Sequence, residues 1–323
     1  MADNILEISD LVVEYHTDNA VIQALNGVTL NVREGETIGL VGETGAGKTT
    51  IARAILRILQ TPPAKFCGGK IVFQGRDVME LSDQEMRAIR GGKIAMIFQD
   101  PMTALNPIER VGWQIAEAFL LHNKVKKGEA MERACEMLEL VGIQSDRVDE
   151  YPHMFSGGMK QRVVIAMALA CNPILLLADE PTTALDVTIQ AQVLELMQSL
   201  KAKLGTSVVM ITHDLGVVAD VCETVAVVYA GEIVEYGTVE DIFARASHPY
   251  TKGLFNSLPR LDTTKDRLIP IRGLMPDPSN LPKGCKFSER CPDVTDECTS
   301  KSPNVVKISP GHQVKCILFG GGE

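Results

Sequence analysis

Residues 42–49 read Gly-Glu-Thr-Gly-Ala-Gly-Lys-Thr, which fits the phosphate-loop pattern G-x-x-x-x-G-K-[ST]. Glycines let a backbone curl until its N–H groups face an anion, and the N-terminus of a following helix adds partial positive charge. Lys48 is expected to reach the β- and γ-phosphates of a nucleotide, and Thr49 to ligate Mg²⁺. The alternative is a simple tight turn between a strand and a helix. The residues expected to contact the nucleotide are Gly42, Glu43, Thr44, Gly45, Ala46, Gly47, Lys48, Thr49 and Thr50.

Two carboxylates follow an aliphatic run at residues 174–178, which is typical of a parallel strand buried on both faces. Open α/β sheets place their ligands at the carboxyl ends of such strands. We therefore predict that Asp179 takes part in Mg²⁺ binding and that Glu180 polarises the attacking water as a general base. An acidic pair at the N-terminus of a helix is the alternative explanation.

Two further polar side chains follow expected strands. The amide of Gln99, after the strand at 93–98, is suited to orient water and to touch Mg²⁺. A neutral imidazole at His213, after the strand at 207–212, is suited to hydrogen-bond the γ-phosphate and to sense its loss. A surface glutamine in a turn and a structural histidine are the alternatives.

A second glycine cluster, Ser156-Gly157-Gly158, precedes an expected helix. Serine is a good N-cap, and glycines leave backbone N–H groups accessible, so this segment predicts a second anion site. An ordinary capped helix is the alternative. Since the chain carries two phosphate-binding devices but one Lys-Thr pair, two chains sharing each nucleotide is a natural solution.

Alternating strands and helices are expected to position these residues. Hydrophobic periodicity predicts strands at 5–15, 21–32, 36–41, 93–98, 174–178 and 207–212, with a hairpin at 225–229 and 232–235. It predicts helices at 48–59, 111–142, 161–170 and 189–204. Prolines recur after residue 249, where regular structure should be sparse.

Composition narrows the class of protein. The net charge of −9 over 323 residues argues against nucleic acid as a partner. We expect no secretory signal, and no apolar run approaches the roughly 20 residues of a spanning helix. The chain is therefore expected to be soluble and cytosolic, with any link to a membrane made through a partner.

Taken in order, these motifs resemble the ATP-binding-cassette (ABC) ATPase family over residues 5 to about 240. The matching segments are Walker A at 42–49, the Q-loop at Gln99, the signature at Ser156, Gly157 and Gly158, Walker B at Asp179 and Glu180, the D-loop at Ala184-Leu185-Asp186, and the switch at His213. In two places the chain departs from the broad family pattern: Phe155 stands for the usual leucine and Met159 for the usual glutamine.

The resemblance implies a fold and an assembly. The fold is an α/β P-loop NTPase (RecA-like) core with a mixed sheet, a helical subdomain, an antiparallel β subdomain and a Cys-rich C-terminal extension. The assembly is a head-to-tail dimer with two ATPs between the subunits, in which Asp186 also lies at the nucleotide. Tyr15 matches the aromatic residue that stacks on adenine, and a strand-edge tyrosine is the alternative.

Residues 151–162, 178–192 and 248–254 look like the D-type ATPase of dipeptide and oligopeptide importers. That resemblance implies ATP hydrolysis that energises peptide uptake at the cytoplasmic face of the membrane. The implied partners are a related F-type ATPase or a second copy, two transmembrane permease subunits and, indirectly, an extracytoplasmic binding protein. Nickel or another small solute is an alternative cargo. A soluble cassette ATPase acting on ribosomes or DNA fits the sequence less well.

Four cysteines, Cys285, Cys291, Cys298 and Cys316, lie in the Pro-rich C-terminal segment. A cytosolic disulfide is not expected there, and four thiolates suit zinc or an iron–sulfur cluster. Their spacings are wider than those typical of structural zinc sites. Resemblance to the D-type importer ATPases implies a [4Fe–4S] cluster, with zinc or free thiols as alternatives. We expect a nucleotide-binding domain at 1–250, with its helical subdomain at about 100–170, and an extension at 251–323.

Overall fold

The computed structural model describes residues 4–183, 185–257 and 270–320. The chain forms two compact units, and each is described by itself. The helical unit holds residues 32–37 and 80–211, and the loop unit holds residues 4–31, 38–79 and the chain from 212 onward. Ala184, which we placed in the D-loop, lies outside the described residues.

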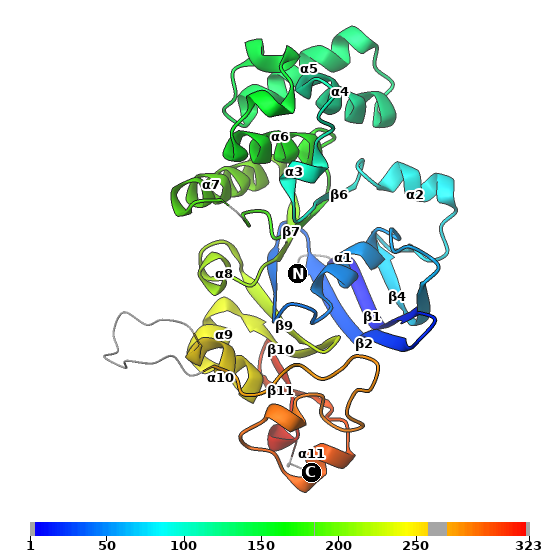
Figure 1. Cartoon of the computed structure of the whole chain (residues 1–323), viewed down its shortest axis with the longest axis vertical. Helices are drawn as coiled ribbons and strands as arrows, with labels where there is room; N and C mark the ends of the chain where they lie inside the picture. The colour runs from blue at the N-terminus through cyan, green and yellow to red at the C-terminus, as the bar shows by residue number, and fades with distance from the viewer. Residues whose placement is uncertain (1–3, 184, 258–269, 321–323) are drawn as a thin grey trace. The chain divides into compact units, whose positions relative to one another are not determined.

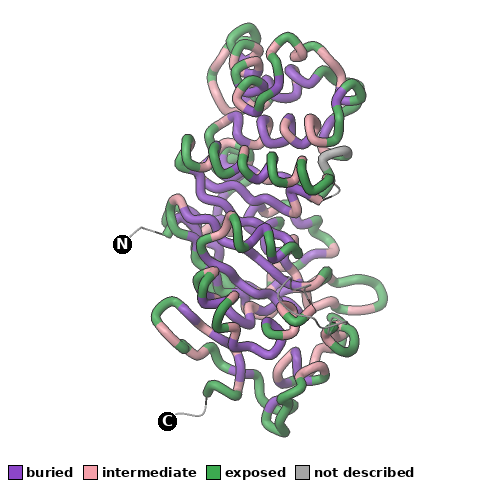
Figure 2. The backbone as a smooth tube through the Cα atoms, turned by 90° about the vertical axis from the view of Figure 1, so that its left-hand side faces the viewer, coloured by how far each residue is buried: buried purple, intermediate pink, exposed green. Residues whose placement is uncertain are grey.

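Three parallel strands form the centre of the helical unit: β6 (Ile94–Ile97), β7 (Leu175–Asp179) and β8 (Ser207–Ile211). The middle strand β7 pairs with both of the others. Every residue of β7 and β8 is buried, as aliphatic runs of this kind require, and buried residues are concentrated along the strands of the molecule (Figure 2). Their carboxyl ends therefore deliver the polar residues that follow them to one edge.

Helices make up most of the rest of this unit, and α4, α5 and α6 pack on one another (Figure 1). The helical pattern predicted at 111–142 forms two helices, because Asn123 adopts an extended conformation and ends α4 before α5 begins. Helix α6 starts four residues earlier than predicted, because Ser156 caps it. The helices of this unit are α2 (Asp83–Ile89), α3 (Pro101–Ala104), α4 (Val111–His122), α5 (Lys127–Leu140), α6 (Gly157–Leu169) and α7 (Val187–Leu204), with 3-10 turns η1 (Ser145–Asp149) and η2 (Pro152–Met154).

The loop unit contains an antiparallel sheet in the order β2-β1-β4-β5. Its strands are β1 (Asn4–His16), β2 (Val21–Arg33), β4 (Ala64–Phe73) and β5 (Arg76–Asp77). Apolar residues of β1, namely Leu6, Ile8, Leu11 and Val13, are buried. Tyr15 lies near the end of the same strand.

A second, mixed sheet of the loop unit runs in the order β11-β12-β10-β9-β3. Strand β3 (Thr37–Val41) pairs in parallel with β9 (Thr224–Tyr229), and the other pairs are antiparallel. The remaining strands are β10 (Glu232–Thr238), β11 (Val305–Ser309) and β12 (His312–Lys315). The helices are α1 (Lys48–Ile55), α8 (Leu215–Val221), α9 (Val239–Arg245), α10 (Pro249–Asn256) and α11 (Asp296–Ser300), with turns η3 (Ser288–Arg290) and η4 (Ile317–Phe319).

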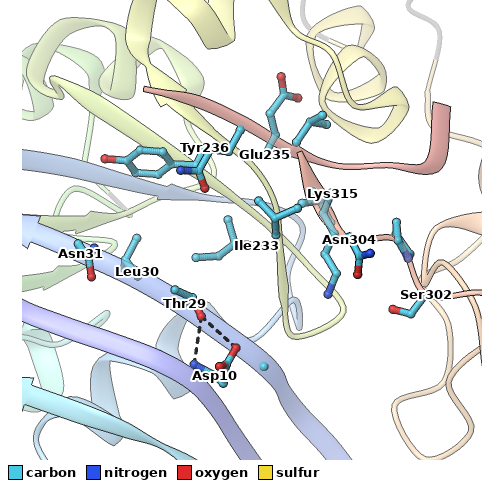
Figure 3. A pocket seen from close by; sticks show the side chains of 16 residues that line it. Asp10, Thr29, Leu30, Asn31, Ile233, Glu235, Tyr236, Ser302, Asn304 and Lys315 are labelled. Atoms are coloured by element: carbon cyan, nitrogen blue, oxygen red, sulfur yellow. Dashed lines mark hydrogen bonds between the residues drawn. The ribbon is translucent and has the colours of Figure 1, made fainter. Parts of the chain in front are cut away.

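The C-terminal segment thus joins the sheet of the loop unit, because β12 pairs with β10. The domain boundary near residue 250 stays a prediction, and the described part of the segment holds more regular structure than its prolines suggested. A cavity of about 580 Å³ lies between β2, β10 and this segment (Figure 3). None of the residues predicted to contact the nucleotide lines it.

Glu235, on β10, ties several segments together. Its carboxylate accepts the backbone N–H groups of Ser247 at 2.7 Å and His248 at 2.9 Å. Nε2 of His312, on β12, lies 2.8 Å from Glu235 Oε1. Both side chains of this last pair are almost fully buried. The carboxylate therefore fixes the C-terminal strand to the sheet.

Substituting Glu235→Ala should lower the free energy of unfolding by about 3 kcal/mol, because it leaves buried donors without their acceptor. Urea denaturation would measure this loss. The exposed Glu240→Gln, on the neighbouring helix α9, is the matched control and should change little. A loss below about 1 kcal/mol for Glu235→Ala would contradict the assigned role.

Candidate nucleotide site and cysteine group

Residues 42–47 curl between the end of β3 and the start of α1. Gly42 has φ 156°, and a Cβ there would lie 2.1 Å from the carbonyl oxygen of Val228 on β9. Gly47 has φ 106°, and its Cβ would lie 2.9 Å from the carbonyl oxygen of Ala24. Both positions therefore require glycine. Gly47 is also the N-cap of α1, so no side chain occupies the N-terminus of that helix.

The side chain of Lys48 is buried and turns back onto this loop. Its Nζ donates to the carbonyl oxygens of Gly42 at 2.6 Å and Glu43 at 3.0 Å. A buried ammonium group needs such acceptors, since burial without them is costly. Phosphate oxygens can replace these carbonyls, so the loop holds its cation ready for an anionic ligand.

The loop unit also carries other predicted site residues. Tyr15 is partly buried at the end of β1, opposite Ala64 of β4. His213 is exposed and follows the last residue of β8. Within the Walker A loop, Ala46 is buried, Glu43, Gly47, Thr49 and Thr50 are partly buried, and Thr44 and Gly45 are exposed.

In the helical unit, Glu180 follows β7 directly and has φ 48°, a left-handed conformation that is rare for a residue with a side chain. Its backbone N–H donates to the carbonyl oxygen of Ile211 at 2.8 Å. Gln99 Nε2 donates to Glu180 Oε2 at 3.1 Å, and Thr183 Oγ1 donates to the same oxygen at 2.9 Å. Asp179 is buried beside it at the end of the strand. The structure therefore brings Gln99, Asp179 and Glu180 together at one edge.

The glycine cluster of the same unit forms the start of α6. Ser156 Oγ accepts the N–H of Met159 at 3.4 Å, and Gly157 and Gly158 make the first turn. A Cβ on Gly158 would lie 2.6 Å from the side chain of Ile189, in the first turn of α7. Asp186 caps α7 by accepting the N–H of Ile189 at 3.0 Å. Ser156 and Asp186 therefore cap two helices that meet at Gly158.

Arg147 contacts both residues that depart from the family pattern, and sequence patterns did not single it out. Its guanidinium lies 4.6 Å from the ring centroid of Phe155, and its Nη1 lies 3.4 Å from Met159 Sδ. Arg147 also pairs with Glu150 at 2.6 Å. The bulky residues at 155 and 159 thus pack on one arginine beside the capped start of α6.

The four C-terminal cysteines form no disulfide, and each is partly or fully buried. The backbone N–H of Cys285 donates to the carbonyl oxygen of Cys298 at 2.8 Å. Burial, with smaller contributions from Cys316, Cys298 and Cys291, raises the pKa of the Cys285 thiol to about 11. Four cysteine thiols in one segment are a suitable donor set for a metal centre, since a bound cation favours the thiolate form.

Sulfurs around a tetrahedral zinc ion lie about 3.8 Å apart, given Zn–S bonds of about 2.3 Å. Among the described residues, one group of three potential metal ligands has its ligand atoms within 4.8 Å of one another. This group is the largely exposed trio Glu14, His16 and Cys67. The sulfurs of the four tail cysteines do not form such a group.

Comparison with known proteins shows the family. Residues 25–183 match the family described as "ABC transporter", and residues 234–298 match "Oligopeptide/dipeptide transporter, C-terminal region". The oligopeptide transport ATP-binding protein OppD of Bacillus subtilis is 51% identical over 318 residues, which cover 98% of this chain and 89% of OppD. The chain belongs to the ATP-binding proteins of oligopeptide and dipeptide ABC importers.

Other relatives agree with this assignment. A probable peptide ABC transporter ATP-binding protein of Sinorhizobium fredii is 52% identical over 98% of this chain and 95% of its own length. A dimeric ATP-binding cassette bound to ADP and Pi in a post-hydrolysis state is 29% identical, with a TM-score of 0.65 over 72% of this chain and 98% of that chain. This importer subunit is therefore an α/β ABC ATPase that binds ATP and energises peptide transport. Its described residues contain no helix long and apolar enough to cross a membrane.

Lys48→Ala should weaken ATP binding by about a hundredfold, because it removes charge-assisted hydrogen bonds to the phosphates. Equilibrium titration with a fluorescent ATP analogue would measure the affinity. The exposed Lys65→Ala, on β4, is a control that should bind ATP normally. Equal affinities for the two variants would contradict the assignment of the loop.

Proposed function

We propose that this importer ATPase hydrolyses ATP with Glu180 as the general base and with Lys48 on the phosphates. The observation that carries this proposal is the way Glu180 is held, in a rare backbone conformation with Gln99 and Thr183 both donating to one carboxylate oxygen. A base fixed in this way is pre-oriented toward a water molecule before the substrate arrives. Thr49, Gln99 and Asp179 bind Mg²⁺, and His213 senses the γ-phosphate.

Two such subunits share each nucleotide in the proposed mechanism. The Walker A loop of one subunit and Ser156, Gly157 and Gly158 of its partner contact the same ATP, with Tyr15 on the adenine and Asp186 beside the site. Support comes from Gly157 and Gly158, which carry no side chain in the first turn of α6, and from the dimeric form of the structural relative. The second subunit is a related F-type ATPase or another copy of this chain.

The subunit works at the cytoplasmic face of the membrane, bound to two permease subunits that receive substrate from an extracytoplasmic binding protein. Peptides are the proposed cargo. Relatives named for oligopeptide and for dipeptide transport are similarly close, at 51% and 50% identity, so the length of the peptide is left open. Charge supports a protein partner over nucleic acid, since the chain carries a net −9.

Cys285, Cys291, Cys298 and Cys316 hold a [4Fe–4S] cluster in this proposal. The support is the presence of four buried or partly buried cysteines in one segment, where Cys285 interacts electrostatically with the other three. When bound, such a cluster cross-links the segments that carry its ligands, and we assign it a structural or regulatory role. The chain's own residues supply the four thiolates and the protein packing around them.

Glu180→Gln should lower kcat for ATP hydrolysis by at least about a hundredfold while ATP binding is retained, because only the base is lost. ATPase rates and light scattering with ATP would measure turnover and a trapped dimer. The exposed Glu195→Gln, on α7, is the matched control. Unchanged hydrolysis in Glu180→Gln would overturn the mechanism.

Anaerobically purified protein should contain about four irons and four sulfides per chain and absorb broadly near 400 nm. Cys298→Ser should lose most of this iron, whereas Cys171→Ser, outside the group, should keep it. Metal analysis and absorbance spectra would check both variants. A colourless protein with one zinc per chain would contradict the cluster and assign zinc to these cysteines. A metal-free protein would assign them as free thiols.

A further inference from the structure

Arg290 connects the C-terminal segment to the nucleotide loop. It ends turn η3, directly before Cys291, and its side chain is 4% exposed. Its Nη1 and Nη2 donate to the two carboxylate oxygens of Glu43 at 2.7 and 3.0 Å. Nε donates to the carbonyl oxygen of Arg272 at 2.9 Å, and Nη1 lies 3.4 Å from the Tyr229 hydroxyl. The guanidinium thus makes four polar contacts, and its two Nη atoms bind the Walker A residue Glu43 in a bidentate manner.

The same glutamate is held at its backbone. Its N–H donates to the hydroxyl of Tyr250 at 2.9 Å, and its carbonyl oxygen accepts Lys48 Nζ. Tyr250 is fully buried and packs on Tyr229 and Phe287, with ring centroids 4.5 and 5.4 Å away. When ATP draws Lys48 toward its phosphates, the contacts from Arg290 and Tyr250 remain. Glu43 therefore keeps its place through residues outside the Walker A motif.

Arg290 also neutralises the negative charge of Glu43 in the phosphate-binding loop. A carboxylate inside a phosphate-binding loop repels the ligand, since like charges at short range disfavour each other. The buried guanidinium cancels that charge through a paired geometry that a lysine cannot reproduce. With Arg290 gone, Glu43 would present its negative charge beside the site of the phosphates.

We infer that Arg290 is a positioning residue for ATP binding, which fixes the Walker A loop through Glu43 and neutralises its carboxylate, so that the C-terminal segment is required for normal nucleotide affinity. Tyr250 is the second positioning residue, acting on the backbone of Glu43. This inference rests on the ATPase assignment and not on the proposed cluster. It gives the segment a role in the motor reaction itself.

The test compares Arg290→Gln, Arg290→Lys, Glu43→Gln and the double variant Arg290→Gln/Glu43→Gln, with the exposed neighbour Glu289→Gln as control. Titrations with fluorescent analogues of ATP give affinities, and ATPase assays separate KM from kcat. Arg290→Gln should weaken ATP binding by about tenfold and raise KM more than it lowers kcat. Arg290→Lys should recover part of the affinity. The affinity of Arg290→Gln for adenosine, which has no phosphate charge, should differ little from that of the unchanged protein.

The double variant decides between charge and general damage. If Arg290 neutralises Glu43, removing both charges should bring ATP affinity back toward the value for Glu43→Gln alone. Unchanged ATP affinity in Arg290→Gln would overturn the inference, as would a double variant that binds as weakly as Arg290→Gln. Should Arg290→Gln not fold, as thermal melting would show, Tyr250→Phe decides, because it removes only the hydroxyl on Glu43 and should also weaken ATP binding. Iron content of each variant separates this outcome from loss of the proposed cluster.

Discussion

The close approach of Gly42 to β9 is the constraint on which the nucleotide loop depends. No side chain fits between residue 42 and the carbonyl oxygen of Val228, so the chain can leave β3 at this angle only through glycine. That exit turns the carbonyl oxygens of Gly42 and Glu43 toward Lys48, which donates to both. The glycines and these hydrogen bonds therefore shape the loop, and phosphate oxygens offer Lys48 a second set of acceptors. Pre-organisation of this kind spares the binding energy that ordering a floppy loop would consume.

The C-terminal segment shows how a Pro-rich stretch can still be rigid. It has little periodic structure of its own, yet it places Phe287 edge-on to Tyr229 at 5.2 Å and adds β12 to the sheet. Buried aromatic pairs contribute beyond the area they cover, and Glu235 adds hydrogen bonds that no water can replace. The segment belongs to the same compact unit as the Walker A loop, which is why its arginine can act there.

Local patterns predicted much of this molecule. Glycine spacing located the Walker A loop, and bare aliphatic runs located β7 and β8, because both signals depend on neighbours in the chain. The same reasoning did not locate the break between α4 and α5, since the extended conformation of Asn123 has no strong sequence signal. It also could not foresee that Glu43 pairs with Arg290, because the partners of a variable loop position are set by tertiary packing. Arg147 was missed for the same reason, although Phe155 and Met159 had marked the place where it packs.

The choice of glutamate at position 43 makes physical sense only together with Arg290. Alone, an acidic residue among backbone N–H groups that await phosphate would weaken the site, and a neutral residue would avoid that cost. A buried arginine alone would be equally unfavourable, since an uncompensated charge away from water is strongly destabilising. Each charge is acceptable because the other is present, and the pair joins the segment that carries Cys291 to the loop that binds ATP. A replaceable hydrophobic contact would hold the loop as firmly, but it would not make phosphate binding depend on whether the C-terminal segment is folded in place.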